Sequence, residues 1–137
     1  MAQQKPATNV AAALPAGEGF ARSYLAYLLA SASFNVSNEF HAMLQTWRMS
    51  VPEWRVLACL PAVEGLSVGE LAAMALMKQP RLTKVLDRME RDGLLKRRNA
   101  ASDRRRVTLH LTAKGHTRVA PVLKAARTHE ADVLSQF

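Results

Sequence analysis

The chain has 137 residues, of which 49% are hydrophobic and 22% charged, and it carries a formal net charge of +8. This length supports one hydrophobic core but not two, and the composition excludes a wholly disordered chain. No apolar run reaches the roughly 18 residues that a membrane-spanning helix requires, and the N-terminus lacks the pattern of a secretion signal. We therefore expect a cytoplasmic protein with no membrane contact.

The positive charge is concentrated in one segment. Between Lys78 and Arg106 the basic residues outnumber the acidic ones by seven, which accounts for nearly all of the net +8. Such a strip is typical of proteins that neutralise nucleic-acid phosphates, and a merely solvated charged face is the alternative. Charge alone does not separate the two, so the order of the predicted elements has to decide.

The first predicted element is a long helix from about Glu18 to Met49. No proline interrupts this stretch, and apolar residues recur along it at helical spacing. A continuous helix of this length exceeds what a small core covers, so we expect part of its apolar stripe to need a second subunit. Its middle, from Ser31 to Asn38, is rich in serine and asparagine and is a place for a bend or a cavity lining.

Two shorter helices are predicted next. Pro52 suits the first turn of a helix that buries Trp54, Leu57 and Leu60 and ends at Gly65. The segment Ser67-Val68-Gly69-Glu70 has the spacing of a capping box, so a third helix starts there. Its predicted core contacts are Leu71, Ala72 and Met74.

The fourth predicted helix, from about Gln79 to Asp92, has two different faces. Plotted at 100° per residue, its apolar residues share one side and its basic residues lie across the opposite arc. The apolar set is Leu82, Val85, Leu86 and Met89. Gly93 is placed to close this helix at its C-terminus.

After Gly93 the pattern alternates, which predicts two strands, Leu94–Arg98 and Val107–Leu111, around a polar loop from Asn99 to Arg106. Val107, Leu109 and Leu111 are expected on one face of the second strand, with His110 pointing outward to solvent. Thr112 is predicted to cap a final helix that runs toward Phe137, with a kink at Pro121. The fold class is therefore mainly helical with a small hairpin wing.

Two short helices followed by a basic helix and a basic hairpin are the parts of a winged helix-turn-helix. The basic helix fits the major groove of duplex DNA, and the hairpin tip can place an arginine in the minor groove. The candidate DNA contacts of the helix are Lys78, Gln79, Pro80, Arg81, Thr83, Lys84 and Arg88. Those of the wing are Arg98, Asp103, Arg104, Arg105 and Arg106.

No feature of the sequence indicates an enzyme, a cofactor or a metal site. The single cysteine, Cys59, excludes an intramolecular disulfide and a multi-thiolate zinc site. Its apolar neighbours favour a core residue over a redox sensor, because only Arg55 is near enough in sequence to lower its pKa. The four histidines have no metal-ligand spacing, and no nucleophile motif or glycine-rich phosphate loop is present.

An ordered set of motifs resembles the MarR family of regulators. The spacing between the motifs fits the family pattern without insertion or deletion from Glu70 to Gly115: Glu70-Leu71-Ala72, Pro80, Thr83, Asp87-Arg88-Met89-Glu90, Gly93-Leu94, Ser102-Asp103-Arg104-Arg105 and Leu111-Thr112-Ala113-Lys114-Gly115. The resemblance implies a homodimer of winged helix-turn-helix subunits. It also implies repression at a pseudo-palindromic operator and release of the DNA by a small aromatic or phenolic effector.

The resemblance also assigns roles to single residues. Arg105 is the implied wing-tip residue that enters the minor groove, and Asp103 is the carboxylate that orients it. The effector pocket is implied near the junction of the first, second and last helices. Its candidate residues are Arg22, Ser31, Asn35, His41 and Trp54, although packing is the plainer explanation for the aromatic ring.

Three features depart from the family pattern. Lys78 stands where a capping serine, threonine or aspartate is usual, and Leu76 occupies a turn position where glycine is common. In the family the final helix normally continues and is followed by another that helps to build the dimer, whereas this chain stops at Phe137. We therefore expect either a truncated C-terminal dimerisation element or dimerisation through the first and last helices alone.

The predicted organisation has four parts. They are a flexible segment (1–17), a long helix that contributes to dimerisation (18–50), the DNA-binding region (51–112) and the C-terminal dimerisation helix (113–137). Two alternatives keep this fold: a protein-interaction module that docks an acidic partner, and a nonspecific architectural DNA binder without effector control.

Overall fold

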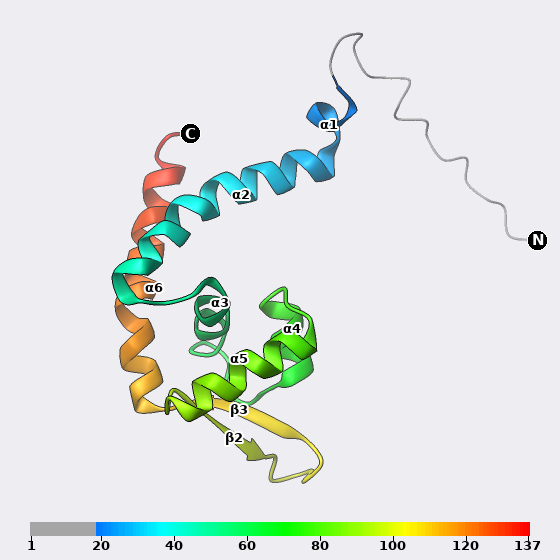
Figure 1. Cartoon of the computed structure of the whole chain (residues 1–137), viewed down its shortest axis with the longest axis vertical. Helices are drawn as coiled ribbons and strands as arrows, with labels where there is room; N and C mark the ends of the chain where they lie inside the picture. The colour runs from blue at the N-terminus through cyan, green and yellow to red at the C-terminus, as the bar shows by residue number, and fades with distance from the viewer. Residues whose placement is uncertain (1–18) are drawn as a thin grey trace, which may run out of the picture. The chain divides into compact units, whose positions relative to one another are not determined.

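A computed structural model describes residues 19–137, and the predicted flexible segment 1–17 lies outside the described residues. Contacts divide the chain into two units, Met1–Glu39 and Phe40–Phe137. Within the described part the order is α1 (Phe20–Ser23), α2 (Leu25–Met43), η2 (Leu44–Trp47), α3 (Val51–Cys59), β1 (Leu66–Ser67), α4 (Val68–Met74), α5 (Gln79–Arg91), β2 (Leu95–Asn99), β3 (Val107–Leu111) and α6 (Ala113–Leu134) (Figure 1).

The long first helix is interrupted, so the prediction of one helix from Glu18 to Met49 is wrong. Tyr24 is extended between α1 and α2, with φ −77° and ψ 120°. Helix α2 then tightens into the 3₁₀ turn η2, which ends at Arg48 in a left-handed conformation with φ 50°. A left-handed residue cannot continue a right-handed helix, which gives the physical reason for the second end.

Helix α3 begins as the sequence predicts but ends early. Ser50 caps it by accepting a hydrogen bond from the backbone N–H of Glu53. The helix stops at Cys59 rather than Gly65, and a turn follows in which Gly65 adopts φ +74°. Gly65 thus shapes the turn before a strand rather than closing the helix.

Helix α4 has the predicted capping box. The Ser67 hydroxyl accepts from the N–H of Glu70, and the Glu70 carboxylate accepts from the N–H of Ser67. Leu71 and Ala72 are buried as predicted, but Met74 is 47% exposed and is not a core contact. Met74 is the last residue of the helix, and its side chain points away from the core although the following Ala75 is buried.

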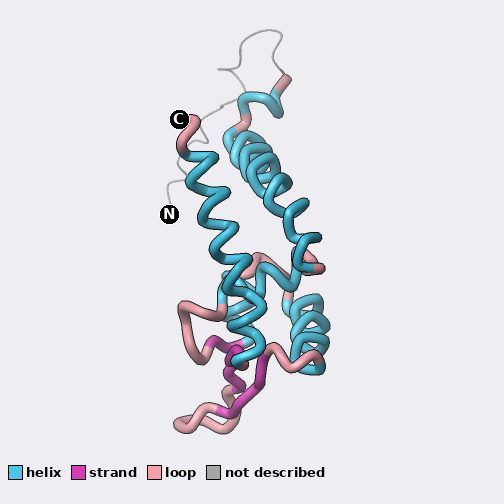
Figure 2. The backbone as a smooth tube through the Cα atoms, turned by 90° about the vertical axis from the view of Figure 1, so that its left-hand side faces the viewer, coloured by secondary structure: helices cyan, strands magenta, loops and turns pink. Residues whose placement is uncertain are grey.

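The sheet has three antiparallel strands in the order β1-β3-β2. Strand β2 pairs with β3 in the register Leu95↔Leu111 to Asn99↔Val107, which makes the predicted hairpin. Strand β1 has only two residues, too few to show an alternating pattern, and the sequence analysis missed it. Figure 2 shows the hairpin loop projecting at the end of the unit that holds the sheet.

The central strand β3 corrects the predicted faces. Leu109 is fully buried, but Val107 is exposed and Thr108 is buried. His110 is half-buried and bonded to Thr108, with 2.8 Å between Nε2 and Oγ1, so the prediction of a solvated His110 is wrong. β3 is the inner strand, with β1 paired on one edge and β2 on the other. The burial of Leu109 and Thr108 and the half-burial of His110 show that side chains on both of its faces are at least partly covered.

Helix α6 follows directly from β3. Thr112 caps it by accepting from the N–H of Gly115, as predicted, and its hydroxyl also donates to the carbonyl of Gly93. A Cβ on Gly115 would overlap the carbonyl oxygen of Leu94, so only glycine permits this approach. Pro121 lies inside α6, and the kink expected there stays a prediction.

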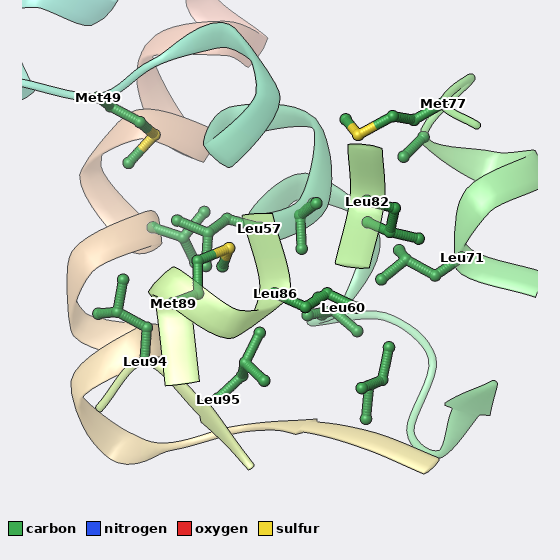
Figure 3. Close-up of a cluster of buried hydrophobic side chains, with 14 of the residues drawn as sticks. Met49, Leu57, Leu60, Leu71, Met77, Leu82, Leu86, Met89, Leu94 and Leu95 are labelled. Atoms are coloured by element: carbon green, nitrogen blue, oxygen red, sulfur yellow. The ribbon is translucent and has the colours of Figure 1, made fainter. Parts of the chain in front are cut away.

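The core of the second unit fixes the orientation of α5. Leu82, Leu86 and Met89 are at most 1% exposed, and Figure 3 shows them among leucines from α3, α4 and β2. Burying a side chain of this size contributes about 1.5–3 kcal/mol. Since three such residues lie on one side of α5, the opposite side is held toward solvent. Gly93 closes the helix with φ +75°, as predicted.

Candidate nucleic-acid interface

The outer face of α5 carries the predicted helix contacts. All seven are exposed: Lys78, Gln79, Pro80, Arg81, Thr83, Lys84 and Arg88. The side chains of Arg81, Lys84 and Arg88 take part in none of the salt bridges among residues 19–137. Their charge is therefore not neutralised within the described part of the chain, and it is available to an anionic partner.

The start of α5 lacks a side-chain cap. Lys78 occupies the N-cap position with an extended backbone and makes no capping hydrogen bond, as the sequence indicates. The first N–H groups of a helix have no partner inside the helix, and the helix dipole adds positive potential there. The free N–H groups, the helix dipole and the lysine charge are unfavourable in the isolated helix, but together they favour binding of a phosphate.

The turn before α5 adopts the geometry for which glycine is usual. Leu76 has φ +53° and is 82% exposed. The next residue, Met77, is buried and donates its N–H to the carbonyl of Ala72 at 3.0 Å, which ties the turn back onto α4. Leu76 therefore has a strained backbone conformation, and the turn between α4 and α5 has the predicted helix-turn-helix geometry.

The wing is closed by its own backbone. The N–H of Ala100 donates to the carbonyl of Arg106 at 2.8 Å, and the N–H of Arg106 donates to the carbonyl of Asp103 at 3.0 Å. The carboxylate of Asp103 accepts from the backbone N–H of Arg105 at 2.9 Å. Asp103 thus holds Arg105 through the main chain, and the guanidinium of Arg105 is exposed together with those of Arg98 and Arg104.

Two other arginines of the basic strip form salt bridges within the protein. Arg97 bridges Asp87 at 2.9 Å and Glu90 at 3.0 Å, which joins β2 to the flank of α5. Arg106, a predicted DNA contact, bridges Glu70 of α4 at 2.7 Å. Spacing along the sequence does not distinguish these arginines from the free ones.

A further arginine that sequence reasoning missed joins α6 to the start of α3. Arg118 donates to Glu53 at 2.7 Å and to the carbonyls of Trp47 and Arg48 at 3.2 Å each. The hydrogen bond to Glu53 raises the pKa of Arg118 further. These contacts give hydrogen-bond donors to carbonyls at the end of η2. No sequence pattern predicts that a distant arginine supplies them.

The five effector candidates are divided between the two units. Arg22, Ser31 and Asn35 belong to the first unit, and His41 and Trp54 to the second. The Trp54 ring packs on Phe40 with 5.0 Å between centroids, which is the packing role considered for it. Burial and the nearby Arg55 lower the pKa of His41.

A depression of about 340 Å³ lies against α6 in the second unit. Its lining includes Met43, Pro121, Lys124, His129 and Asp132, and none of the five candidates. The volume is within the range of small-molecule sites, and the lysine is suited to pair with a carboxylate. The α6 residues of this lining share one side of the helix, but spacing along the sequence does not show that the end of α2, with Met43, lies against them.

Cys59 is half-buried, and burial raises the pKa of its thiol. A raised pKa disfavours the reactive thiolate, in agreement with the predicted packing role. Among residues 19–137 no cluster of three metal-ligating side chains occurs. No helix in the same range combines the length and apolar character that crossing a membrane requires.

Known proteins share this architecture and parts of this sequence. The model of the MarR family matches residues 49–107. A MarR family transcriptional regulator from Silicibacter pomeroyi is 37% identical, with 88% of this chain and 85% of that chain covered and a TM-score of 0.80. The transcriptional repressor CouR, solved bound to a 23-mer DNA duplex, is 30% identical, with 89% and 84% covered and a TM-score of 0.71.

Curated relatives match over a shorter stretch. The homoprotocatechuate degradative operon repressor of Escherichia coli is 32% identical over 76 residues, which cover 56% of this chain and 51% of the repressor. The matched part therefore spans about half the length of such relatives. The match to the family model and the similarity to a solved member along most of both chains show that the chain belongs to the MarR family of transcriptional regulators.

Proposed function

We propose that this protein is a dimeric, sequence-specific repressor that binds duplex DNA and releases it when a small aromatic compound binds. The observation that carries the proposal is the set of exposed cations on the outer face of α5 and on the wing. Arg81, Lys84, Arg88, Arg104 and Arg105 are exposed and take part in no salt bridge within residues 19–137.

The proposed division of labour on DNA follows from groove geometry. Helix α5 enters the major groove, where Gln79 is suited to adenine and Arg81 to guanine. Thr83, Lys84 and Arg88 contact bases or phosphates, and Lys78 with Pro80 places the helix start against the backbone. Arg105 enters the minor groove, where a narrow A·T-rich stretch has enhanced negative potential.

The proposed dimer uses the terminal helices, and residues 51–112 bind DNA. Helix α2 supports this division, because Phe40 is its only buried residue while Leu25, Leu29 and Phe34 are more than 60% exposed. Two recognition helices related by a two-fold axis match a pseudo-palindromic operator. The repressor CouR, solved with a DNA duplex, supports DNA as the partner.

The proposed effector is a small aromatic acid. The repressor of homoprotocatechuate degradation among the relatives supports this chemistry. The depression against α6 supplies apolar walls from Met43 and Pro121 and a cation from Lys124, and its lining also includes the carboxylate of Asp132. Its volume of about 340 Å³ accommodates a single ring with short substituents.

The first experiment selects duplexes from random DNA with the purified chain and then measures affinity in a gel-shift titration. We expect one pseudo-palindromic sequence to be preferred over its shuffled version. Arg105→Ala should weaken binding to that sequence, whereas Arg81→Ala should also relax base preference at one position, at a cost of about 1–3 kcal/mol. Unchanged affinity in both variants would exclude the proposed interface.

The same titration separates the alternatives. Equal binding to selected and shuffled duplexes, at every salt concentration, would favour the architectural function. Absence of any duplex binding would favour a protein-interaction module. An effector is tested by thermal unfolding with a panel of aromatic acids, since a ligand that binds only the folded state raises the melting temperature.

A further inference from the structure

The carboxylate of Glu70 has two partners, one on each oxygen. Oε2 accepts from the backbone N–H of Ser67 at 3.3 Å and completes the capping box of α4. Oε1 accepts from the guanidinium of Arg106 at 2.7 Å. The capping box requires only one oxygen, and glutamine serves there as well as glutamate. The negative charge of Glu70 is therefore engaged by Arg106 rather than by the cap.

Arg106 lies at the base of the wing. It is the last residue before β3, and its carbonyl and its N–H both close the wing loop. Among residues 19–137, its ion pair with Glu70 is the one hydrogen bond that joins loop residues 100–106 to an element outside the hairpin. The arginines at the tip, Arg104 and Arg105, have no such link and remain exposed.

We propose that Arg106 is a positioning residue for DNA recognition, which holds the wing against the first turn of α4 through Glu70 and leaves Arg104 and Arg105 to contact the duplex. This inference rests on the proposed DNA-binding function, and it removes Arg106 from the set of residues that touch DNA. The wing angle relative to the recognition helix decides whether both can engage adjacent grooves at once. Arg97 already joins β2 to α5, and the link from the wing base to α4, the neighbour of α5, adds a second restraint on that angle at the loop end of the hairpin.

The competing mechanism is that Arg106 leaves Glu70 when DNA binds and contacts a phosphate. The side chains of the pair are about half exposed, so the bond is weak enough for either behaviour. The two mechanisms differ in the number of counterions released. A phosphate contact contributes about 0.9 to the slope of log affinity against log salt, whereas a bond within the protein contributes nothing.

The test compares Arg106→Gln and Glu70→Gln with Arg104→Gln. Glu70→Gln keeps an acceptor for the capping box while it removes the ion pair, together with the acidic charge in the first turn of α4. Arg104→Gln removes the same charge two residues away, where no ion pair is lost. Affinity for the selected and shuffled duplexes is measured between 50 and 300 mM KCl, and the double variant completes a thermodynamic cycle.

We expect Arg104→Gln to lower the salt slope by about 0.9 and Arg106→Gln to leave it unchanged. Arg106→Gln and Glu70→Gln should each reduce the preference for the selected duplex about two- to fivefold, and the double variant should lose no more than either single one. A slope reduced by Arg106→Gln as much as by Arg104→Gln, or fully additive losses, would overturn the inference. DNA binding by the wild type would stand in either case.

A second measurement does not depend on DNA. Amide hydrogen exchange at Ala100 and Arg106 reports closure of the wing loop, since both N–H groups are bonded within it. Glu70→Gln should speed their exchange about two- to fivefold, while Arg104→Gln should leave it unchanged. Equal exchange in wild type and Glu70→Gln would show that the ion pair does not hold the wing, whether or not an operator is found.

Discussion

At the scale of single residues, arginines with the same charge have different roles in this protein. Arg81 and Arg105 are exposed and take part in no salt bridge within residues 19–137, whereas Arg97 and Arg118 are held by acidic side chains of other elements. The acidic partner of Arg118 is 65 residues away in sequence. The sequence predicted where positive charge accumulates, but the fold decides which of these charges a ligand can meet.

His41 makes the free energy of unfolding depend on pH. Its pKa is lowered in the folded state by burial and by Arg55, so the unfolded chain binds a proton more readily. Stability from this residue is therefore complete above the ordinary pKa of 6.5 and falls as the pH is lowered through the region just below it. We expect His41→Gln to lose less free energy of unfolding than wild type between pH 7.5 and 5.5.

The measurement is urea denaturation at both pH values. His116→Gln is the matched control, because His116 is exposed on α6. If the His41 and His116 variants respond to pH in the same way, the packing around His41 is not the source of the sensitivity.

Leu76 stores backbone strain that a glycine would relieve. Its φ of +53° costs a leucine about 1–2 kcal/mol, while glycine adds about 0.4–1 kcal/mol of unfolded-state entropy. Since Leu76 is 82% exposed, little packing is lost on truncation. Leu76→Gly should therefore raise the free energy of unfolding by about 0.5–1 kcal/mol in urea titrations.

Leu76→Ala is the control for that variant. Alanine removes the same exposed side chain but keeps the penalty for a left-handed backbone, so it should give no gain. Equal stabilisation by alanine and glycine would mean that the exposed side chain, rather than the backbone angle, is the unfavourable feature.

At the scale of elements, local chemistry predicted how helices begin. The caps at Ser67 and Thr112 and the glycine end at Gly93 are confirmed, because each rests on hydrogen bonds between residues a few positions apart. Helix ends that depend on tertiary contacts were misplaced, as at Cys59, and the two-residue strand β1 was missed. Strand β1 exists only because β3 offers it a partner.

The junction of β2 and α6 depends on the absence of one side chain. Gly115 packs its backbone against the carbonyl of Leu94, and an added Cβ would overlap that oxygen. Gly115→Ala should lower the free energy of unfolding by about 1–3 kcal/mol, because the first turn of α6 must move away from the hairpin. Urea denaturation measures the loss.

Gly69→Ala is the matched control for this substitution. The nearest atom to its added Cβ is the side-chain nitrogen of Gln79 at 3.5 Å, an ordinary contact. Gly115→Ala as stable as Gly69→Ala would contradict a steric role for Gly115.

At the scale of the whole molecule, the terminal helices expose apolar side chains that water does not favour. Leu25, Leu29 and Phe34 of α2 and Leu134 of α6 are all more than 60% exposed. Apolar helix faces of this kind mark interfaces between subunits. We expect the chain to sediment as a dimer at micromolar concentration, and Leu29→Glu to raise its dissociation constant at least tenfold.

Val63→Glu is the control for sedimentation. Val63 is also exposed and apolar, but it lies in the turn after α3 rather than on a terminal helix. A monomeric wild type, or equal weakening by both substitutions, would remove the terminal helices from the dimer interface.

The sequence by itself determined the helix-turn-helix and hairpin order, the helix caps and the basic strip from Lys78 to Arg106. These features follow from periodicity and from hydrogen bonds between near neighbours, and both depend only on residues that are close in sequence. Only the tertiary structure decided the ends of α2 and α3, the burial of Thr108 and the engagement of Arg106 and Arg118. Each of these depends on residues from distant segments meeting in space, and neither spacing nor composition specifies which segments meet.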